Sequence, residues 1–167
     1  MADDTFDHKV SGAGLGQTTA ETCWYASYAM LMNWKGRSID SIKDSVVKAG
    51  YGFQDYYDHG LPRSDYRKVG LALRLTGFRG PYIAELADDF VAFAQLLKNY
   101  GPIWVAFSNP GEHIVVVSGV NARMNQIHIV NPWNKAGGLD ADDQYPDPST
   151  FKKRLNLNTE WSAQTPN

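Results

Sequence analysis

A single cysteine, Cys23, stands at the start of a long apolar run in this 167-residue chain. Thr18, Thr19 and Thr22 before it are candidate helix N-caps, and Glu21 suits the first turn of a helix. A free cysteine, with a pKa of about 8.5, is mostly protonated at neutral pH, but the N-terminus of a helix favours the thiolate. Although a lone cysteine on an apolar helix is more often a core residue, this placement makes Cys23 a candidate nucleophile.

A nucleophilic thiol needs a base beside it, and the chain contains four histidines. His8 lies in a polar leader and His59 in a loop rich in glycine and tyrosine, so neither is expected to be anchored by a regular element. His113 follows a glycine-containing turn and begins the β-branched run HIVVVSGV. A histidine at the start of a strand can be held rigidly against the end of a helix, which makes His113 the candidate partner of Cys23.

A third group must orient the imidazole. The segments 113–120 and 126–131 alternate as strands do and are separated by a short turn, which predicts a β-hairpin. In a hairpin the start of the first strand lies opposite the end of the second, so His113 is expected beside Asn131. Strand alternation places His128 on the opposite face, and we exclude it from the site.

A fourth group would stabilise the oxyanion that forms during acyl transfer. Gln17 precedes Cys23 by six residues, and its side-chain amide could converge with the Cys23 backbone N–H on one oxygen. Taken singly, each signal has a simpler explanation as a solvated glutamine, a surface histidine or a turn with a packed tryptophan. Their occurrence together in the order Gln, Cys, His, Asn predicts a cysteine-dependent hydrolase.

These motifs, in this order, resemble the papain-like cysteine proteases: Gln17, the pair CW at Cys23–Trp24, His113, and NPW at 131–133. The resemblance implies that Gln17 completes the oxyanion hole, that Cys23 is the nucleophile and that His113 is the general base and acid. It also implies that Asn131 orients the imidazole and that Trp133 shields this asparagine. The expected chemistry is acyl transfer through a thioester on Cys23.

The motifs are trimmed relative to archetypal members of that family. The context AETCW lacks their first cysteine and glycine, NPW replaces NSW, and the histidine follows the cysteine by 90 positions. The chain is similar to the compact papain-like domains of secreted bacterial effectors and interbacterial toxins, and to bacteriocin-processing peptidases. The resemblance implies an antibacterial or host-directed endopeptidase, delivered without a signal peptide of its own, for example by type VI secretion. It would cleave a protein in the cytoplasm of a target cell and be covered by a cognate immunity or inhibitor protein; without delivery it would be cytoplasmic.

Three further residues are expected to contact the substrate: Trp24, Glu112 and Trp133. Trp24 fits a core position equally well, because other apolar residues follow it at helical spacing. The segment 50–62 reads as a loop that is either a surface flap or one wall of the cleft. In the resembled fold the helical half supplies that wall, which favours the cleft.

Three other functions stay open on the sequence. An amidase of cell-wall peptides would use the same nucleophile, but such enzymes usually carry a second histidine or a carboxylate where Asn131 stands. A peptidase that processes leader peptides is normally fused to a transporter. A non-enzymatic binding module would keep Cys23 as a structural residue, with a slow thiol that does not respond to His113.

The first half of the chain has helical patterns and the second half has strand patterns. Cap signals and glycine stops predict helices over 22–35, 38–50, 61–77 and 88–101. After Pro102 an antiparallel sheet is predicted over 103–108, 112–120 and 126–131, with one more helix near 149–155. The fold class is therefore α+β and, by the resemblance, papain-like, with the Cys23 helix buried centrally and the histidine and asparagine on the sheet.

Length and composition favour one domain, which we place at 16–160, between a flexible leader over 1–15 and a tail over 161–167. The net charge of −2 gives no reason to expect nucleic acid or an acidic membrane as a partner. No apolar run approaches the ~18 residues of a membrane helix, and the acidic opening is unlike a signal peptide. Neither metal-ligand spacing nor a phosphate-binding loop is present, so no metal or cofactor is expected.

Overall fold

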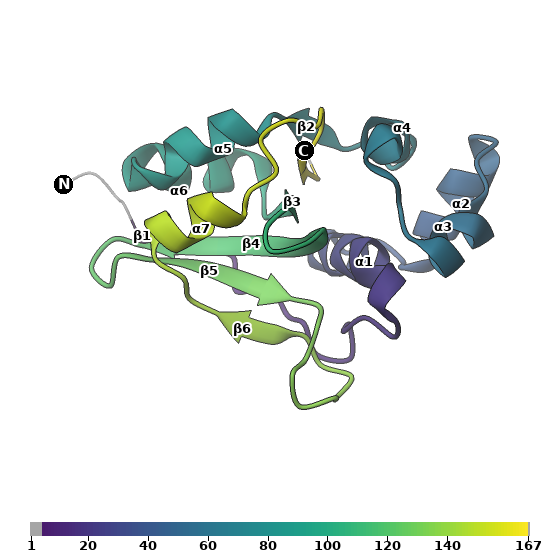
Figure 1. Ribbon diagram of the computed structural model, residues 1–167, viewed down its shortest axis with the longest axis horizontal. Helices are drawn as coiled ribbons and strands as arrows, with labels where there is room; N and C mark the ends of the chain where they lie inside the picture. Colours follow the sequence, from purple (N-terminus) through teal and green to yellow (C-terminus); the bar gives the residue numbers. More distant parts are fainter. Residues whose placement is uncertain (1–4, 167) are drawn as a thin grey trace.

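The computed structural model describes residues 5–166 of the chain. Its centre is a seven-stranded antiparallel sheet in the order β2-β7-β3-β4-β5-β6, and β1 pairs with β4 as well (Figure 1). The strands are β1 (Thr5–Asp7), β2 (Thr76–Phe78), β3 (Ile103–Phe107), β4 (His113–Asn121), β5 (Gln126–Asn131), β6 (Asp142–Gln144) and β7 (Ala163–Thr165).

Helices pack on both sides of this sheet. In Figure 1, α5, α6 and α7 gather on one side of the molecule, and α1 to α4 gather on the other. The helices are α1 (Cys23–Lys35), α2 (Asp40–Lys48), α3 (Phe53–His59), α4 (Tyr66–Ala72), α5 (Gly80–Ala87), α6 (Phe90–Tyr100) and α7 (Pro148–Arg154), with short 3-10 helices η1 (Ala20–Thr22) and η2 (Arg63–Asp65). The predicted α+β, papain-like fold class is confirmed.

Strand alternation divides the core into two hydrophobic clusters. Ile114 and Val116 of β4 pack into the cluster that contains α1, whereas Val115 and Val117 pack into the cluster that contains α5, α6 and α7. Successive side chains of β4 therefore supply both faces of the sheet, which explains why its sequence is almost continuously apolar.

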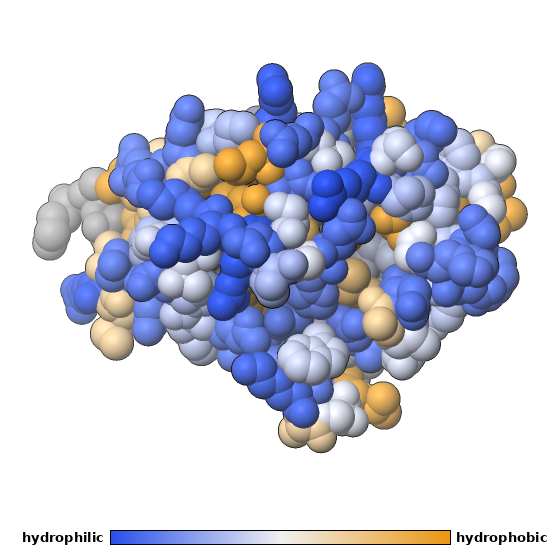
Figure 2. Space-filling model, viewed as in Figure 1, coloured by the Kyte–Doolittle hydropathy of each residue, from blue (hydrophilic) through white to orange (hydrophobic). Residues whose placement is uncertain are grey.

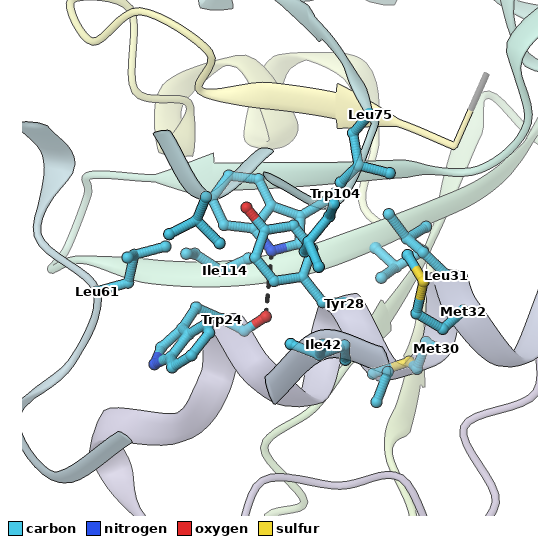
Figure 3. Packing of buried hydrophobic residues seen from close by; sticks show 14 of the residues in the cluster. Trp24, Tyr28, Met30, Leu31, Met32, Ile42, Leu61, Leu75, Trp104 and Ile114 are labelled. Atoms are coloured by element: carbon cyan, nitrogen blue, oxygen red, sulfur yellow. Dashed lines mark hydrogen bonds between the residues drawn. The ribbon is translucent and has the colours of Figure 1, made fainter. Parts of the chain in front are cut away.

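Helix α1 is the buried centre of the first cluster, as the sequence predicts. Tyr28 stacks on Trp104 of β3, with ring centroids 4.9 Å apart, and the Trp104 indole N–H donates to the backbone carbonyl of Trp24 at 3.2 Å (Figure 3). The Tyr28 hydroxyl donates to the side chain of Gln164 at 2.8 Å. Gly36 ends the helix with a left-handed φ of 78°, a conformation that glycine adopts without strain. These contacts fix where the first residue of α1 lies.

The two termini differ from the sequence prediction, which separates them from the folded domain. In the described part of the leader, residues 5–7 form β1 against β4, and Val10 is buried. In the tail, β7 lies between β2 and β3 and is buried throughout. Each of these strands has only three residues, too few for a recognisable alternation, so their pairing is set by the sheet.

Three elements of the helical half also differ. The segment predicted as a loop, 50–62, contains α3, and α5 has no counterpart among the predicted helices. The helix predicted to stop at Gly77 ends at Ala72, and Gly77 lies within β2. A Cβ at Gly77 would lie 2.0 Å from the Trp161 ring, so this glycine permits close packing of a strand and does not end a helix.

Hydrophilic residues cover most of the face shown in Figure 2, where hydrophobic residues form small, separate groups. Among residues 5–166, no helix is both long and apolar enough to cross a membrane.

Candidate active site

Cys23 is the first residue of α1, as the sequence predicts. It follows directly on η1, and the Thr22 hydroxyl oxygen accepts the backbone N–H groups of Thr18 and Thr19 at 3.2 and 3.1 Å. These bonds hold the turn before the helix in place. The sulfur therefore lies at the N-terminal end of a 13-residue helix, where the dipole favours negative charge.

The start of β4 is anchored to α1 one turn beyond Cys23. The Ser27 hydroxyl donates to the backbone carbonyl of Ile114 at 3.2 Å, and the backbone N–H of Ile114 is hydrogen-bonded to the Cys23 thiol. Because His113 immediately precedes Ile114, this contact brings the strand start to the helix start. Cys23 and His113 both line a pocket of about 160 Å³, which we call the Cys23 pocket.

The third predicted group also lies where the hairpin places it. Strands β4 and β5 pair with Val116 opposite Val130, and His113 Nε2 is 2.7 Å from Asn131 Oδ1. The backbone N–H of Trp133 donates to the same Oδ1 at 3.0 Å, which identifies this atom as the amide oxygen. An oxygen can only accept, so Nε2 of His113 carries the proton and Nδ1 is left as the unprotonated, basic nitrogen.

Burial determines the protonation of this pair. It raises the pKa of the Cys23 thiol, and the backbone N–H groups of Ile114, Trp24 and Cys23 itself counteract only part of the shift. Burial also lowers the pKa of His113, which the hydrogen bond with Asn131 partly offsets. Both shifts favour the uncharged forms. These shifts act against the thiolate that the helix position favours.

Gln17 lies close along the chain, but its side chain lines a different pocket from that of Cys23. Its amide N–H donates to the Thr19 carbonyl at 2.9 Å, and its Oε1 is buried without a partner among the described residues. The Gln17 backbone N–H donates to the Pro132 carbonyl at 2.8 Å, which ties this loop to the segment after Asn131. The structure thus places the glutamine backbone beside the site and leaves its amide outside the Cys23 pocket.

The three predicted substrate contacts lie in different environments. Trp24 lines the Cys23 pocket but is only 1% exposed, and its indole N–H donates to the Tyr56 carbonyl at 3.2 Å, so it mainly belongs to the core. Glu112 lines the same pocket and pairs with Arg63 at 2.6 Å. Trp133 is 50% exposed and lines a larger pocket of about 610 Å³ on the Asn131 side of His113, which we call the Trp133 pocket.

Several residues of these pockets are not identified by the sequence reasoning. Glu21, His59 and Tyr66 line the Cys23 pocket, and burial together with the charges of Glu112 and Cys23 raises the pKa of the Tyr66 hydroxyl.

The Trp133 pocket is also lined by Gln144, Tyr145, Lys135 and Arg154. Gln144 accepts from the Asn131 amide nitrogen at 3.4 Å, so β6 helps to hold the side chain of Asn131 in place. These residues come from short or irregular segments that carry no motif.

His128, which the sequence places on the opposite face, belongs to a separate cluster. Its Nδ1 lies 2.6 Å from Asp7 Oδ2, its Nε2 lies 2.7 Å from Asp143 Oδ1, and its ring stacks on Tyr145. The cluster links β1 and β6 to β5. Within the part of the chain that the structure describes, no group of three or more histidine, cysteine or acidic residues is arranged to hold a metal ion.

The comparison with protein families agrees with this geometry. The family model for papain-like cysteine protease AvrRpt2 matches residues 7–145, which include Gln17, Cys23, His113 and Asn131. No curated protein matches the sequence. Because the family match covers most of the chain, the chain belongs to the papain-like cysteine proteases of the AvrRpt2 family, a bacterial effector type, and is a hydrolase of peptide bonds.

Proposed function

We propose that Cys23 is the nucleophile, that His113 is the general base and acid, and that Asn131 orients the imidazole. The observation that carries this proposal is the 2.7 Å hydrogen bond from His113 Nε2 to Asn131 Oδ1, made at the edge of the pocket that Cys23 lines. It leaves Nδ1 of His113 as the nitrogen that can take the thiol proton. An asparagine in the orienting position also favours a protease over a cell-wall amidase.

In this mechanism the Cys23 sulfur attacks the carbonyl carbon of a peptide bond while its proton moves to His113. The oxyanion is held by the backbone N–H of Cys23, and His113 protonates the leaving amine as the C–N bond breaks. A water molecule then attacks the thioester, giving its proton to His113, and the sulfur recovers a proton when the acid product departs. The complete cycle returns Cys23 to the thiol and His113 to the neutral imidazole.

Gln17 is proposed as the second oxyanion donor, after rotation of its side chain. Two facts support this role. Its backbone is fixed by the bond to Pro132, and its buried Oε1 has no partner among the described residues. A buried acceptor without a partner costs roughly 1–3 kcal/mol, so the observed position of the amide is not strongly favoured. Rotation toward a substrate oxyanion exchanges the bond to Thr19 for a charge-assisted bond.

The catalytic pair can be tested by alkylation, because Cys23 is the only cysteine and every alkyl group on sulfur reports on it. The rate with iodoacetamide is measured from pH 5 to 9 in the wild type, in His113→Ala and in His128→Gln as a matched control. We expect the wild type and His128→Gln to react readily at pH 7, and His113→Ala to react about tenfold more slowly or worse. Equal rates in all three proteins would leave Cys23 as a structural thiol of a binding module.

The chain is further proposed to act as a secreted effector that cleaves a protein in the cytoplasm of a rival or host cell. The match to an effector-type protease family supports this role. Type VI secretion and a cognate immunity protein belong to the same proposal. Cytoplasmic expression in candidate target cells should inhibit growth or create new protein N-termini, and Cys23→Ala should do neither. If the wild type and Cys23→Ala have the same effect, the effector role is wrong.

A further inference from the structure

His113 separates two pockets whose lining charges are opposite. The Cys23 pocket is lined by the carboxylates Glu21 and Glu112, and no lysine or arginine in the described part of the chain lines it. The Trp133 pocket is lined by Lys135 and Arg154, and no carboxylate of residues 5–166 lines it. A substrate that crosses the catalytic pair therefore meets acidic side chains at one end and basic side chains at the other.

The proposed chemistry decides which half of the substrate enters each pocket. The acyl half becomes bonded to the Cys23 sulfur, so it occupies the pocket that Cys23 lines. The leaving amine takes its proton from His113, so the residues that follow the scissile bond lie on the other side of the imidazole. That side is the Trp133 pocket, which His113 and Asn131 line and Cys23 does not.

The two cations of the Trp133 pocket are available to a ligand. Within residues 5–166, neither Lys135 nor Arg154 forms an ion pair, whereas Glu112 in the other pocket is already paired with Arg63 at 2.6 Å. The pocket volume of about 610 Å³ is also much larger than the 160 Å³ of the Cys23 pocket. Selectivity by charge should therefore be stronger on the leaving side than on the acyl side.

The remaining lining gives the pocket a way to hold an extended chain. Trp133 and Tyr145 are 50% and 52% exposed and both line it, and the Tyr145 ring stacks on His128 with one face. Such rings offer apolar surface to a peptide with little loss of side-chain entropy. Aromatic surface beside free cations suits a peptide segment that carries a carboxylate, because the cations select the charge while the rings contact the chain.

We propose that the Trp133 pocket is a specificity site for an acidic residue on the leaving side, an aspartate or glutamate within the first three positions after the scissile bond. Three extended residues correspond to about 10 Å of substrate chain. The inference rests on the proposed roles of Cys23 and His113. It names the substrate class as proteins cut on the amino-terminal side of an acidic segment.

The test is digestion of a peptide library made from a whole proteome, with cleavage sites identified by mass spectrometry. Four proteins are compared: the wild type, Cys23→Ala, the double variant Lys135→Glu/Arg154→Glu, and Arg123→Glu. Arg123 is exposed in the turn at the far end of the β4–β5 hairpin, so its reversal is a matched change of charge away from the pockets. Thermal unfolding of each variant checks that it is folded.

We expect wild-type sites to be enriched in aspartate or glutamate on the leaving side, and Arg123→Glu to behave in the same way. The double variant should lose the enrichment and favour lysine or arginine instead. On matched peptides, replacing the acid by lysine should lower wild-type kcat/KM about tenfold, since each partly exposed pair contributes little.

Three results would overturn the inference, and they can be told apart. Cysteine-dependent cleavage without acidic enrichment would remove the charge selectivity and leave the protease function intact. Enrichment that survives the double reversal would place the selectivity outside this pocket. If the wild type shows no cleavage beyond that of Cys23→Ala, the proposed catalytic residues are wrong, and the specificity site with them.

Discussion

Two histidines, His113 and His128, lie on neighbouring strands of the same sheet and have partners of opposite character. His113, at the start of β4, faces the neutral amide of Asn131 and shares a pocket with Cys23. His128, in the middle of β5, lies between the carboxylates of Asp7 and Asp143 at 2.6 and 2.7 Å. The two imidazoles are each held by hydrogen bonds, and their pKa values are shifted in opposite directions.

The difference follows from what each partner does to the imidazole proton. Burial favours neutral His113, and an amide adds no charge to reverse this, so the ring can gain and lose a proton during a reaction cycle. Burial also opposes the charge of His128, but its hydrogen bonds with two carboxylates outweigh it and raise the pKa. Since a neutral imidazole donates only one hydrogen bond, both carboxylates are satisfied only by the charged ring. The first arrangement suits catalysis, and the second suits a fixed structural link.

The largest expected effect comes from replacing Cys23 or His113. Cys23→Ala and His113→Ala should each lower kcat/KM at least about 1,000-fold, because each removes one of the two groups proposed as nucleophile and base. The free energy of unfolding should change little in Cys23→Ala, whose side chain is small. Cleavage of a peptide identified from the library measures the first quantity, and urea unfolding measures the second. Retention of a tenth of the activity in His113→Ala would assign the base to another residue.

The next effect comes from changing the partner of His113. Asn131→Ala removes the group that orients the ring and should lower kcat about 10- to 100-fold. Asn131→Asp keeps a hydrogen-bond acceptor but adds a charge, which raises the pKa of His113. Since the base must be neutral, the acidic limb of the pH profile of kcat/KM should lie below about pH 6.5 in the wild type and move to higher pH in Asn131→Asp. A profile that does not move would show that His113 does not act as the base.

The pairing of His113 with Asn131 can be predicted from the sequence because a single short hairpin determines it. Two adjacent β-branched runs are joined by a short turn, so their antiparallel pairing follows from the turn, although the register shift between Val117 and Gly119 does not. The start of α1 can be predicted for a similar reason, since its threonines and its apolar run are contiguous. Both signals are local, and they fix the backbone positions of Cys23 and His113.

The rest of the site depends on contacts between distant segments. Asp7 is 121 positions from His128, and a strand of three residues carries no pattern that predicts this pairing. The loop before Cys23 is held by Gly14 N–H to Asp140 and Gly16 N–H to the Leu139 carbonyl, so the backbone position of Gln17 depends on a segment more than 100 residues away. Spacing along the chain could place Gln17 near Cys23, but it could not set its side-chain direction.

The third effect is a loss of stability on replacing His128, the histidine between two carboxylates. His128→Gln leaves two carboxylates facing an uncharged side chain, so the free energy of unfolding should fall by roughly 2 kcal/mol. Most of kcat/KM should survive, because His128 lies outside both pockets that flank the catalytic pair. Urea unfolding and peptide cleavage give the two numbers. A loss of activity as large as that of His113→Ala would mean that the cluster, through β6 and Gln144, determines the position of Asn131.

The smallest effect is the pH dependence of stability, for which the two histidines have opposite signs. Because the pKa of His128 is raised in the folded protein, its protonation stabilises the fold at pH values below the pKa of about 6.5 in the unfolded chain. This contribution is lost as the pH rises through the pKa of the folded state. Because the pKa of His113 is lowered in the folded protein, protonation of His113 destabilises the fold at pH values below about 6.5. This loss of stability disappears as the pH rises toward 6.5. Asp7, whose pKa falls to about 2 mainly because hydrogen bonds from His128 and Ser118 outweigh burial, loses its contribution only between about pH 4 and 2.

Urea midpoints measured between pH 5 and 9 should show these signs directly. His128→Gln should abolish the loss of stability above pH 6.5, whereas His113→Gln should reduce the loss below it. His8 has a pKa lowered by burial and contributes with the same sign as His113, so the acidic decline should become shallower in His113→Gln without vanishing. If both substitutions changed the same limb of the curve, the two imidazoles would have the same charge in the folded protein, and the contrast between an amide partner and two carboxylate partners would not explain their roles.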